Sequence, residues 1–596
     1  MIQYTISASL PNQHLFNVSI QIDSPSKDGQ QLTLPNWIPG SYLIRDFSKH
    51  LTNLTAQTLD GETLNIESLE KSTWKVEKTV DAILIEYQVY AWDLSVRGAH
   101  FDQTHAFFNG TSVFMEVIGK EHLPCAVLIE PSNFTEDENW RIATTLPIQQ
   151  INSDGFGQYQ AKNYRDLIEY PVEMGRFIEL TFEACGIPHR VAITGKIEAN
   201  KLDKKRLIKD LISICEVELN LFSSPYPFQE YLFQVMVTGD GYGGLEHTNS
   251  TALLCSRNNL PYLNTEHPSD KYLQFLELCS HEYFHSWNVK RIKPAVYQTA
   301  KLDKPVYTNQ LWWFEGITSF YDGLFLNHAG IIDSDQYLNR LAKEMTRVYR
   351  MPGRFKQSVA ESSWLTWTKF YQQDENAPNS IISYYTKGSL IALGLDLIIR
   401  AETNNKISLN DILLTLWQKH GLPNKGLAEF EIEKICSDVS GIDFSDFFKK
   451  YLYGTEDLDF ERLFKPFGIQ FKLRPAISSK DLGGTTDTEK TVLSLGANMI
   501  ATNHASLKVT LVWNEQSLSN AGIAAGDEII SLNGYKMSST EKLDELLAIH
   551  NENDILECHY FRRDELHSTQ ITLTKSIADR VQLTKTKNFG KLTWLK

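Results

Sequence analysis

Cysteine is scarce in this sequence and is not arranged for metal binding or disulfide pairing. The seven cysteines are scattered from position 125 to position 558, and no two of them form a CxxC pair. They therefore offer no sulfur metal site, and their odd number favours reduced thiols in a cytosolic protein. The first residues, MIQYTISASLPNQ, also lack a basic stretch followed by an apolar core. We therefore expect no secretory signal peptide.

Long apolar runs and an excess of positive charge are missing as well. The most apolar helical candidate, SLIALGLDLII at 389–399, is too short to span a bilayer and contains Asp396. We interpret it as a core helix and expect no membrane partner. The formal net charge is −15. Because nucleic-acid binding draws on clustered Lys and Arg, this charge argues against nucleic acid as the main partner.

The chain is long enough for several hydrophobic cores, and its pattern changes along its length. Its 596 residues, 42% apolar and 22% charged, are typical of a globular protein with about three or four domains. Short alternating stretches predict an all-β, sandwich-like N-terminal domain over 1–185. Helical periodicity predicts a mainly helical domain over 186–472. A polar linker over 473–490, a small domain to 580 and a tail over 581–596 complete the chain.

Two histidines and a glutamate occur in a stretch that otherwise predicts a buried helix. Ser269 fits an N-cap, and a proline downstream fits a stop, so we predict one helix over 270–292. On this helix His281 and His285 are four residues apart and share a face, where two imidazoles can bind one ion. Glu282 lies beside that ion, which makes it the candidate general base. The alternative is two hydrogen-bonded core histidines with an incidental carboxylate.

A third metal ligand is available downstream. Glu315 stands in a second apolar helix, LWWFEGITSFYDGLFL at 311–326. An unpaired carboxylate among these aromatic residues would be unfavourable, and a bound Zn²⁺ would provide its partner. His281, His285 and Glu315 then form the His₂Glu set of one catalytic zinc per chain, with the fourth position left to water. The ion lowers the pKa of that water from about 15.7 toward about 7, and Glu282 can take its proton.

Two further stretches bear on what is attacked. In FQVMVTGDGYGGLEHTNSTALL (233–254) we predict a strand, a Gly-rich turn and an extended segment. Gly243 and Gly244 would let a substrate backbone approach closely, and Glu246 could pair with a free α-ammonium. The alternative is a hairpin turn with an exposed glutamate. Tyr385 opens another apolar helix, where its phenol could donate a hydrogen bond to an oxyanion or simply pack.

These motifs together resemble those of the gluzincin peptidases. HExxH followed by Glu in an aromatic WFEG helix has this pattern, and GGLE and YTKG resemble the corresponding motifs of aminopeptidase N. HEYFHSWNVKRIKP, LWWFEGITSFYD and LPNWIPGSYLIRDFSKHL (34–51) are more similar still to the glycyl aminopeptidase family. That family combines a β N-terminal domain, a thermolysin-like catalytic domain and a C-terminal PDZ domain. The resemblance therefore covers nearly the whole chain.

Carried over by motif, the resemblance implies a zinc-dependent aminopeptidase acting on peptides with a free N-terminus. It suggests Gly or Ala as the residue removed. One difference is His247, because aminopeptidase N usually has Asn after the anchoring glutamate. Arg97 and Asn109 could border the cleft, although a polar loop is the simpler interpretation. The implied roles are zinc ligation by His281, His285 and Glu315, general base catalysis by Glu282, amine binding by Glu246 and oxyanion binding by Tyr385.

The C-terminal segment predicts a small domain with a peptide-binding groove. KVTLVWNEQSLSNAGIAAGDEIISLNGYKM (508–537) alternates apolar and polar residues around Gly turns, and STEKLDELLAIH (539–550) predicts an amphipathic helix. The segment resembles a PDZ domain, in which a peptide adds as a strand beside that helix. SLGA at 494–497 would hold the terminal carboxylate of the peptide. The groove could equally pack against the catalytic domain or a second subunit.

Three functions are compatible with these motifs. The first is a zinc aminopeptidase acting on short peptides. The second is a zinc endopeptidase that does not require a free N-terminus. The third is a catalytically idle PDZ adaptor that binds peptides and keeps the peptidase fold as a scaffold. The presence of all three ligands, the base and the tyrosine together argues against the third.

Overall fold

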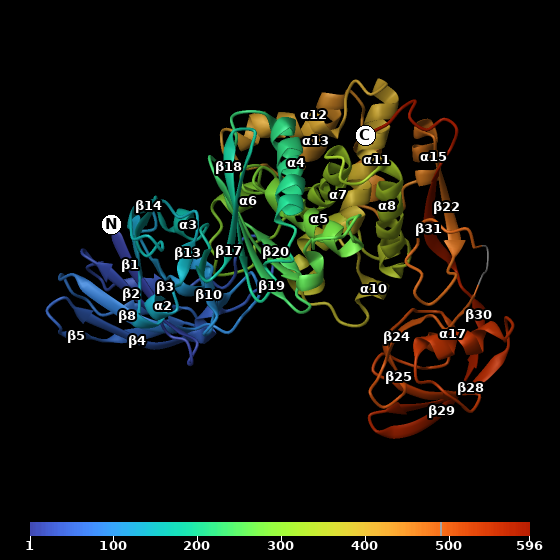
Figure 1. Cartoon of the computed structure of the whole chain (residues 1–596), viewed down its shortest axis with the longest axis horizontal. Helices are drawn as coiled ribbons and strands as arrows, with labels where there is room; N and C mark the ends of the chain where they lie inside the picture. Colours follow the sequence, from blue (N-terminus) through green and yellow to red (C-terminus); the bar gives the residue numbers. More distant parts are fainter. Residues whose placement is uncertain (489–491, 596) are drawn as a thin grey trace. The chain divides into compact units, whose positions relative to one another are not determined.

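The computed structural model describes residues 1–488 and 492–595 (Figure 1). They form two compact units, and each is described by itself. Unit 1 contains Met1–Val306 together with Leu416–Leu427, and unit 2 contains Tyr307–Thr415 and Ala428–Lys596. Residues 489 and 490 of the expected linker and residue 596 of the expected tail lie outside the described residues.

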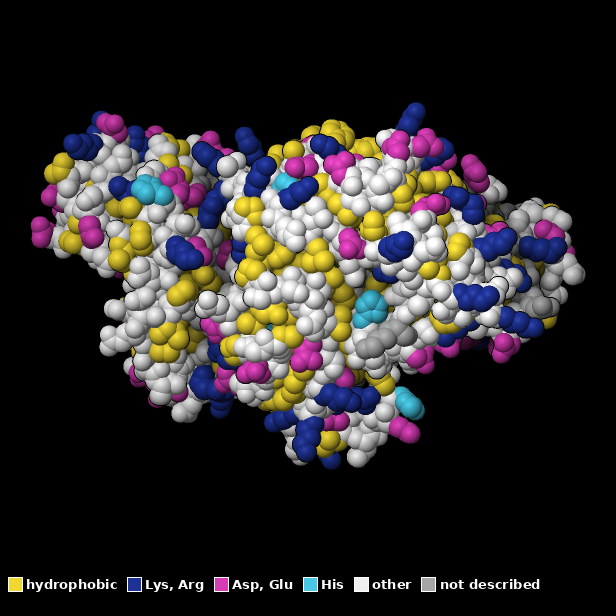
Figure 2. Space-filling view, turned by 90° about the horizontal axis from the view of Figure 1, so that it is seen from above, with side chains coloured by type: hydrophobic (Ala, Val, Ile, Leu, Met, Phe, Trp, Pro, Cys, Tyr) yellow, Lys and Arg dark blue, Asp and Glu magenta, His cyan; other side chains and the backbone are white. Residues whose placement is uncertain are grey.

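Charged side chains of both signs share the surface of the protein. On the face shown in Figure 2, Lys and Arg side chains are interspersed with Asp and Glu side chains. Within the described residues, every helix is too short or too polar to traverse a bilayer.

The first part of unit 1 is a β domain, as the alternating sequence predicts. Its strands are β1 Ile2–Leu10, β2 Leu15–Ile22, β3 Gln31–Thr33, β4 Leu51–Thr58, β5 Thr63–Leu64, β6 Ile66–Glu70, β7 Thr73–Val76, β8 Ile83–Tyr90, β9 Ala99–Phe101, β10 His105–Phe108, β11 Glu116–Val117, β12 Cys125–Glu130, β13 Arg141–Ala143, β14 Ile148–Ile151, β15 Gly157–Ala161 and β16 Val172–Gly175. Its helices are short: η1 Phe47–His50, α1 Gly110–Val113, α2 Asn133–Asp137 and α3 Tyr164–Leu167. The strands form an eight-stranded sheet, β14-β15-β12-β1-β2-β8-β4-β5, and two four-stranded sheets, β13-β16-β10-β9 and β11-β3-β7-β6.

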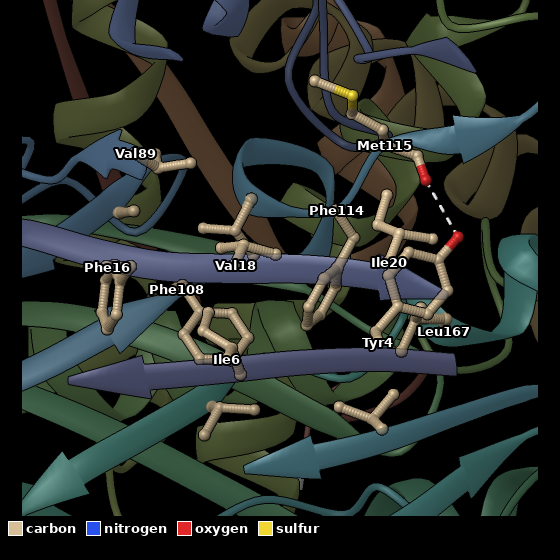
Figure 3. Packing of buried hydrophobic residues seen from close by; sticks show 14 of the residues in the cluster. Tyr4, Ile6, Phe16, Val18, Ile20, Val89, Phe108, Phe114, Met115 and Leu167 are labelled. Carbon is tan, nitrogen blue, oxygen red and sulfur yellow. Dashed lines mark hydrogen bonds between the residues drawn. The ribbon is translucent and has the colours of Figure 1, made fainter. Parts of the chain in front are cut away.

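Aromatic and branched side chains fill the core of this β domain (Figure 3). Alternate residues of β1 and β2 are buried, which explains the period of two in the sequence. The Tyr4 hydroxyl donates a hydrogen bond to the carbonyl of Met115 at 2.9 Å, so this buried phenol is satisfied. The Tyr4 ring also contacts Phe114, with 5.1 Å between ring centroids. These contacts join the large sheet to the segment that follows α1.

The second part of unit 1 carries a five-stranded sheet beside two long helices. The elements are β17 Ile178–Ala184, β18 Ile187–Thr194, α4 Lys204–Phe222, β19 Tyr231–Thr238, β20 Gly243–Glu246, β21 Ser250–Ser256, η2 Arg257–Asn259, α5 Asp270–Phe284, α6 Ala295–Gln298 and η6 Trp417–Gly421. The strand order is β17-β18-β19-β21-β20, so β20 is an edge strand, and it pairs antiparallel with β21. The predicted strand, turn and extended segment over 233–254 are confirmed.

The predicted helix over 270–292 is wrong at its C-terminal end. It begins as expected, because the Ser269 side chain accepts a hydrogen bond from the backbone N–H of Tyr272 at 3.1 Å. However, α5 ends at Phe284. The backbone N–H groups of Asn288 and Lys290 then bond to the carbonyls of residues 284 and 285 in a tight turn. Both residues are buried, and this turn lets Lys290 pair with Glu169 at 3.0 Å and lets the Asn288 carbonyl accept a hydrogen bond from His285 Nδ1 at 2.9 Å.

Unit 2 begins with the helices predicted around Glu315 and Tyr385. The helix predicted over 311–326 is present, but its first part is a π-helix. The elements of this part of unit 2 are η3 Trp312–Ile317, α7 Thr318–His328, α8 Ser334–Tyr349, η4 Pro352–Phe355, α9 Val359–Trp364, η5 Thr366–Phe370, α10 Ala377–Ser380, α11 Thr386–Thr403, α12 Leu409–Leu416, α13 Glu431–Ser440, α14 Ser445–Phe447, η7 Phe448–Leu452, α15 Phe460–Phe464 and η8 Lys465–Phe467.

The expected core helix at 389–399 is confirmed as part of α11. Most of its residues are buried, including Asp396. The Asp396 carboxylate accepts hydrogen bonds from Arg400 Nε at 2.7 Å and from the backbone N–H of Leu409 at 2.9 Å. A buried charge with both an ion-pair partner and a backbone donor is compatible with a core position.

The C-terminal part of unit 2 contains a sheet and one longer helix. The elements are β22 Ile469–Pro475, β23 Leu493–Ser494, β24 Ala497–Ala501, β25 Leu507–Val512, α16 Ser517–Asn520, β26 Glu528–Leu532, β27 Tyr535–Lys536, α17 Thr540–Ala548, β28 Ile555–Arg562, β29 Glu565–Thr572, β30 Thr574–Lys575 and β31 Ala578–Lys585. The main sheet has the order β24-β25-β26-β28-β29, with β27 paired to β26. The expected tail over 581–596 begins within β31, which pairs antiparallel with β22.

Asn379 joins this C-terminal part to the helices of unit 2. Its amide donates to the carbonyl of Val512 at 2.8 Å and accepts from the backbone N–H of Asn514 at 3.1 Å. Asn379→Ala should therefore lower the free energy of unfolding by about 1–3 kcal/mol, because a buried side chain with two backbone partners is lost. Calorimetric unfolding would measure this. The exposed Asn376→Ala is the control, and equal stability of the two variants would contradict the assignment.

Candidate metal centre

His281 lies in the last turn of α5, and His285 is the residue that caps its C-terminal end. The backbone N–H of His285 bonds to the carbonyl of His281 at 3.3 Å, so the i,i+4 relation persists although the helix ends there. The two rings lie edge to face, with 4.7 Å between their centroids. Two imidazoles at this separation can bind one ion.

The turn after α5 orients His285. The Nδ1 atom of His285 lies 2.9 Å from the carbonyl oxygen of Asn288. A carbonyl can only accept, so Nδ1 carries the proton and Nε2 keeps its lone pair for a metal. The next residue, Val289, has a φ of 150°, a conformation that costs free energy for a branched residue. The strained turn therefore holds a carbonyl in the position that selects the ligating tautomer.

Glu282 is held against the glycine-rich strand β20. Its side chain is buried, and a Cβ built on Gly244 would lie only 2.0 Å from Glu282 Oε1. A non-bonded pair of carbon and oxygen atoms cannot approach so closely. Glycine at 244 therefore allows the carboxylate to lie directly on the strand backbone, which explains one of the two glycines of GGLE.

Glu246 is held in a similar way at the other end of β20. A Cβ built on Gly40 would lie 2.5 Å from both carboxylate oxygens of Glu246, and Gly40 has a φ of 94°. Both the conformation and the close approach require glycine. Gly40 belongs to the segment at 34–51, which stands out in the sequence only because it resembles the glycyl aminopeptidase family. The carboxylate of Glu246 thus rests against the backbone of the N-terminal β domain.

A buried ion pair lies close to Glu246. Lys290 Nζ is 3.0 Å from Glu169 Oε2, and Thr248 Oγ1 donates to the same oxygen at 3.2 Å. Burial opposes the charge on Lys290, but Glu169 and then Glu246 raise the pKa of Lys290 above its ordinary value. Lys290 therefore remains a cation and compensates the negative charge of both carboxylates.

His247 lies in the same buried region and is neutral. Burial, reinforced by Lys290, lowers the pKa of His247 to about 3. Within the described residues, neither ring nitrogen of His247 has a hydrogen-bond partner. At neutral pH the side chain next to Glu246 is therefore an uncharged imidazole. This replaces the amide that aminopeptidase N usually has at the position.

Glu315 projects from η3 in unit 2 and is also buried. A Cβ on the following residue, Gly316, would lie 2.7 Å from the Cα of Gly388 on α11. The two glycines therefore let the backbones of η3 and α11 touch. The Thr318 hydroxyl donates to the carbonyl of Phe314 at a distance of 2.6 Å, which gives this π-helical segment an additional bond.

Tyr385 stands immediately before α11, as predicted. Its hydroxyl lies 3.3 Å from that of Tyr371, and its ring stacks on Phe370 with 5.6 Å between centroids. Lys387, from the same YTKG motif, is buried and forms an ion pair with Asp457 at 3.4 Å. The lysine of this motif therefore anchors the start of α11.

Two groups of side chains among the described residues could hold a metal ion. The first is His281, His285 and Glu315, and the second is Glu246, Glu282 and His285; within each group the potential ligand atoms lie within 4.8 Å of one another. The first group offers two imidazoles and one carboxylate, a donor set that suits zinc with one open position. The second has two carboxylates and shares His285 with the first. The donor chemistry therefore favours the first group.

Comparisons with known proteins identify the family. Residues 3–176 match the Peptidase M61 N-terminal domain, and residues 274–391 match the M61 glycyl aminopeptidase domain. A crystal structure of an aminopeptidase N family protein from Idiomarina loihiensis is 40% identical, with 100% of both chains covered and a TM-score of 0.96. The chain belongs to the M61 glycyl aminopeptidase family. As a member of this family it is a metallo-aminopeptidase.

The remaining comparisons add little to the M61 assignment. An M1 zinc metallopeptidase from Deinococcus radiodurans is 11% identical over 77% of this chain and 94% of its own, with a TM-score of 0.48. No curated protein matches the chain. Of the predicted site residues, Glu246 and the two glycines of GGLE lie outside both matched segments.

The contact between β20 and Glu282 gives a test in this M61 protein. Gly244→Ala should displace the Glu282 carboxylate, because the added Cβ has no room. We expect kcat to fall roughly 100-fold, since misplacing a catalytic group by about 1 Å has an effect of this size. Metal content should be unchanged. Gly239→Ala is the control, because its Cβ would meet nothing closer than 3.8 Å. Full activity of Gly244→Ala would contradict the described contact.

Proposed function

We propose that the protein is a zinc-dependent aminopeptidase that removes an N-terminal residue, with Gly or Ala preferred, from short peptides. The main support is the close grouping of potential metal ligands His281, His285 and Glu315. The potential ligand atoms of Glu282, Glu246 and His285 also lie within 4.8 Å of one another. A metal site, a base and an anchor for an amine are the parts that this reaction requires.

Zinc is the metal that we propose for this site, with one ion per chain. His281, His285 and Glu315 would hold it, and the Nδ1–H of His285 is already committed to Asn288. When bound, zinc supplies Lewis acidity, which polarises a peptide carbonyl and lowers the pKa of a water molecule. The His₂Glu donor set leaves a position for this chemistry, whereas a closed structural site would have four protein ligands.

The protein residues would divide the remaining work between them. Glu282 takes a proton from the attacking water and delivers it to the leaving amine, as a buried carboxylate beside the metal site can do. Glu246 pairs with the α-ammonium of the substrate, and Lys290 keeps the buried charges balanced when no substrate is bound. Tyr385 donates its phenolic hydrogen to the oxyanion of the tetrahedral intermediate. Gly243 and Gly244 leave space for the substrate backbone on β20.

The expected domains are part of the proposal. We propose an N-terminal β domain over 1–185, a thermolysin-like catalytic domain over 186–472, a PDZ domain with its linker over 473–580 and a tail over 581–596. The PDZ assignment is supported by the edge strand β24 and by α17, whose apolar face is buried. A peptide, or a segment of this protein, would add to β24 as a further strand.

Two substitutions separate the base from the metal ligands. Glu282→Gln should retain zinc but lose nearly all turnover, by roughly 1000-fold or more, because the amide cannot take a proton. Glu315→Gln should instead lower the zinc content, since a neutral amide is a weaker ligand. Zinc analysis and kcat for alanyl-p-nitroanilide distinguish the two. A fully active Glu282→Gln would refute its role as base.

The requirement for a free amine tests the aminopeptidase proposal against an endopeptidase. Glycyl- and alanyl-p-nitroanilide should be hydrolysed, whereas their N-acetyl forms should not, because acetylation removes the charge that pairs with Glu246. A chelator should abolish the release and added zinc should restore it. Equal hydrolysis of acetylated peptides would favour an endopeptidase. No release despite one bound zinc per chain would favour a peptide-binding adaptor.

A further inference from the structure

The edge strand β20 has an open side whose backbone groups can be assigned. The backbone N–H of His247 bonds to the carbonyl of Ser250 at 2.9 Å, which marks a hydrogen-bonded pair of the β20–β21 hairpin. Bonded and non-bonded pairs alternate along antiparallel strands. The backbone N–H and C=O groups of Leu245 and Gly243 therefore also form hydrogen bonds with β21. The N–H and C=O groups of Gly244 and Glu246 point away from β21, toward the open side.

Arg97 occupies one end of this open side. Its Nη2 donates a hydrogen bond to the carbonyl of Gly244 at 3.1 Å, and its Nη1 would lie 3.4 Å from a Cβ on Gly243. Its buried Nε has no hydrogen-bond partner within the described residues. Among the same residues, the guanidinium is paired with no carboxylate. A half-buried cation without a counter-charge is suited to binding an anion.

The loop that carries Arg97 is held firmly by its neighbours. The Asn109 amide donates hydrogen bonds to the carbonyls of Val96 and Gly98, at 2.8 and 3.2 Å, and so fixes the residues on both sides of Arg97. A Cβ on Gly98 would lie 2.4 Å from Asp93 Oδ2, so the loop is closed tightly on itself. Arg97 is therefore presented by a preorganised loop, and the interpretation of this segment as merely a polar loop is incomplete.

We propose that Arg97 binds the C-terminal carboxylate of the substrate and that the preferred substrates are dipeptides and tripeptides with a free C-terminus. This inference rests on the proposed function, because it takes Glu246 as the anchor for the N-terminus. An extended peptide that adds antiparallel to the open side of β20 starts at Glu246 and runs toward Gly244. These residues are two apart, about 7 Å along the strand. A peptide of two or three residues spans this distance and reaches Arg97.

The chemistry of the guanidinium explains the preference for short peptides. Its planar fork can hold both oxygens of a carboxylate while one N–H remains on the Gly244 carbonyl. A longer peptide would place a neutral amide of its backbone at this position. The charge-assisted hydrogen bonds would then be lost, and the substrate would bind less tightly. Peptides that are amidated at the C-terminus should show the same loss.

The test compares trialanine with trialanine amide, which differ only at the C-terminal group. The wild-type enzyme should prefer the acid by roughly 10- to 100-fold in kcat/KM, the value of charged hydrogen bonds, with the difference mainly in KM. In Arg97→Gln this preference should fall to about one, and Arg97→Lys should retain part of it. Arg176→Gln is the control, because Arg176 is exposed and paired with Glu138 at 2.6 Å. The control should keep the wild-type preference.

The possible outcomes separate this inference from the proposed function. Equal rates for the acid and the amide in the wild type would overturn the role of Arg97 but leave the aminopeptidase intact, provided that alanyl-p-nitroanilide is hydrolysed. An equal loss on both peptides in Arg97→Gln would show that Arg97 only supports β20, and would also overturn the inference. If neither the peptides nor the anilide is hydrolysed, the proposed function itself fails and this inference fails with it.

Discussion

The close approach of two buried carboxylates to His285 is the constraint on which the rest of the site depends. Glu246, Glu282 and His285 bring their polar atoms within 4.8 Å of one another in an environment largely closed to water. Like charges at this separation repel, and burial makes each charge costly. Lys290 offsets part of this cost, and the carbonyl of Asn288 fixes the protonation of His285. A bound cation would offset most of the remainder.

Glycines provide the space in which this arrangement fits. The Glu282 carboxylate lies against the backbone at Gly244, and the Glu246 carboxylate lies against the backbone at Gly40. In unit 2, Gly316 and Gly388 bring the segment carrying Glu315 against the start of α11. Glycine weakens strands and helices, so its use here exchanges stability for close contacts. The catalytic roles that we propose thus depend on residues without side chains.

Local patterns in the sequence predict the elements well but not the contacts between distant segments. The β domain, the helix carrying His281 and the strand carrying Glu246 follow from periodicity and capping, and they are confirmed. The end of α5 could not be predicted, because the buried Lys290 in the turn that follows it pairs with Glu169, which is distant in the sequence. Nor could the roles of Gly40 and Arg97, since each lies more than a hundred residues from the strand it contacts. The catalytic roles themselves stay predictions.

The location of the metal tests the central claim most directly. Crystals of the zinc-loaded protein should be measured on both sides of the zinc absorption edge, so that anomalous scattering identifies the ion without assumptions about the site. The account predicts one zinc per chain, with the imidazoles of His281 and His285 and the carboxylate of Glu315 at about 2.0–2.2 Å. Zinc bound instead by Glu246, Glu282 and His285, or zinc absent from both groups, would contradict it.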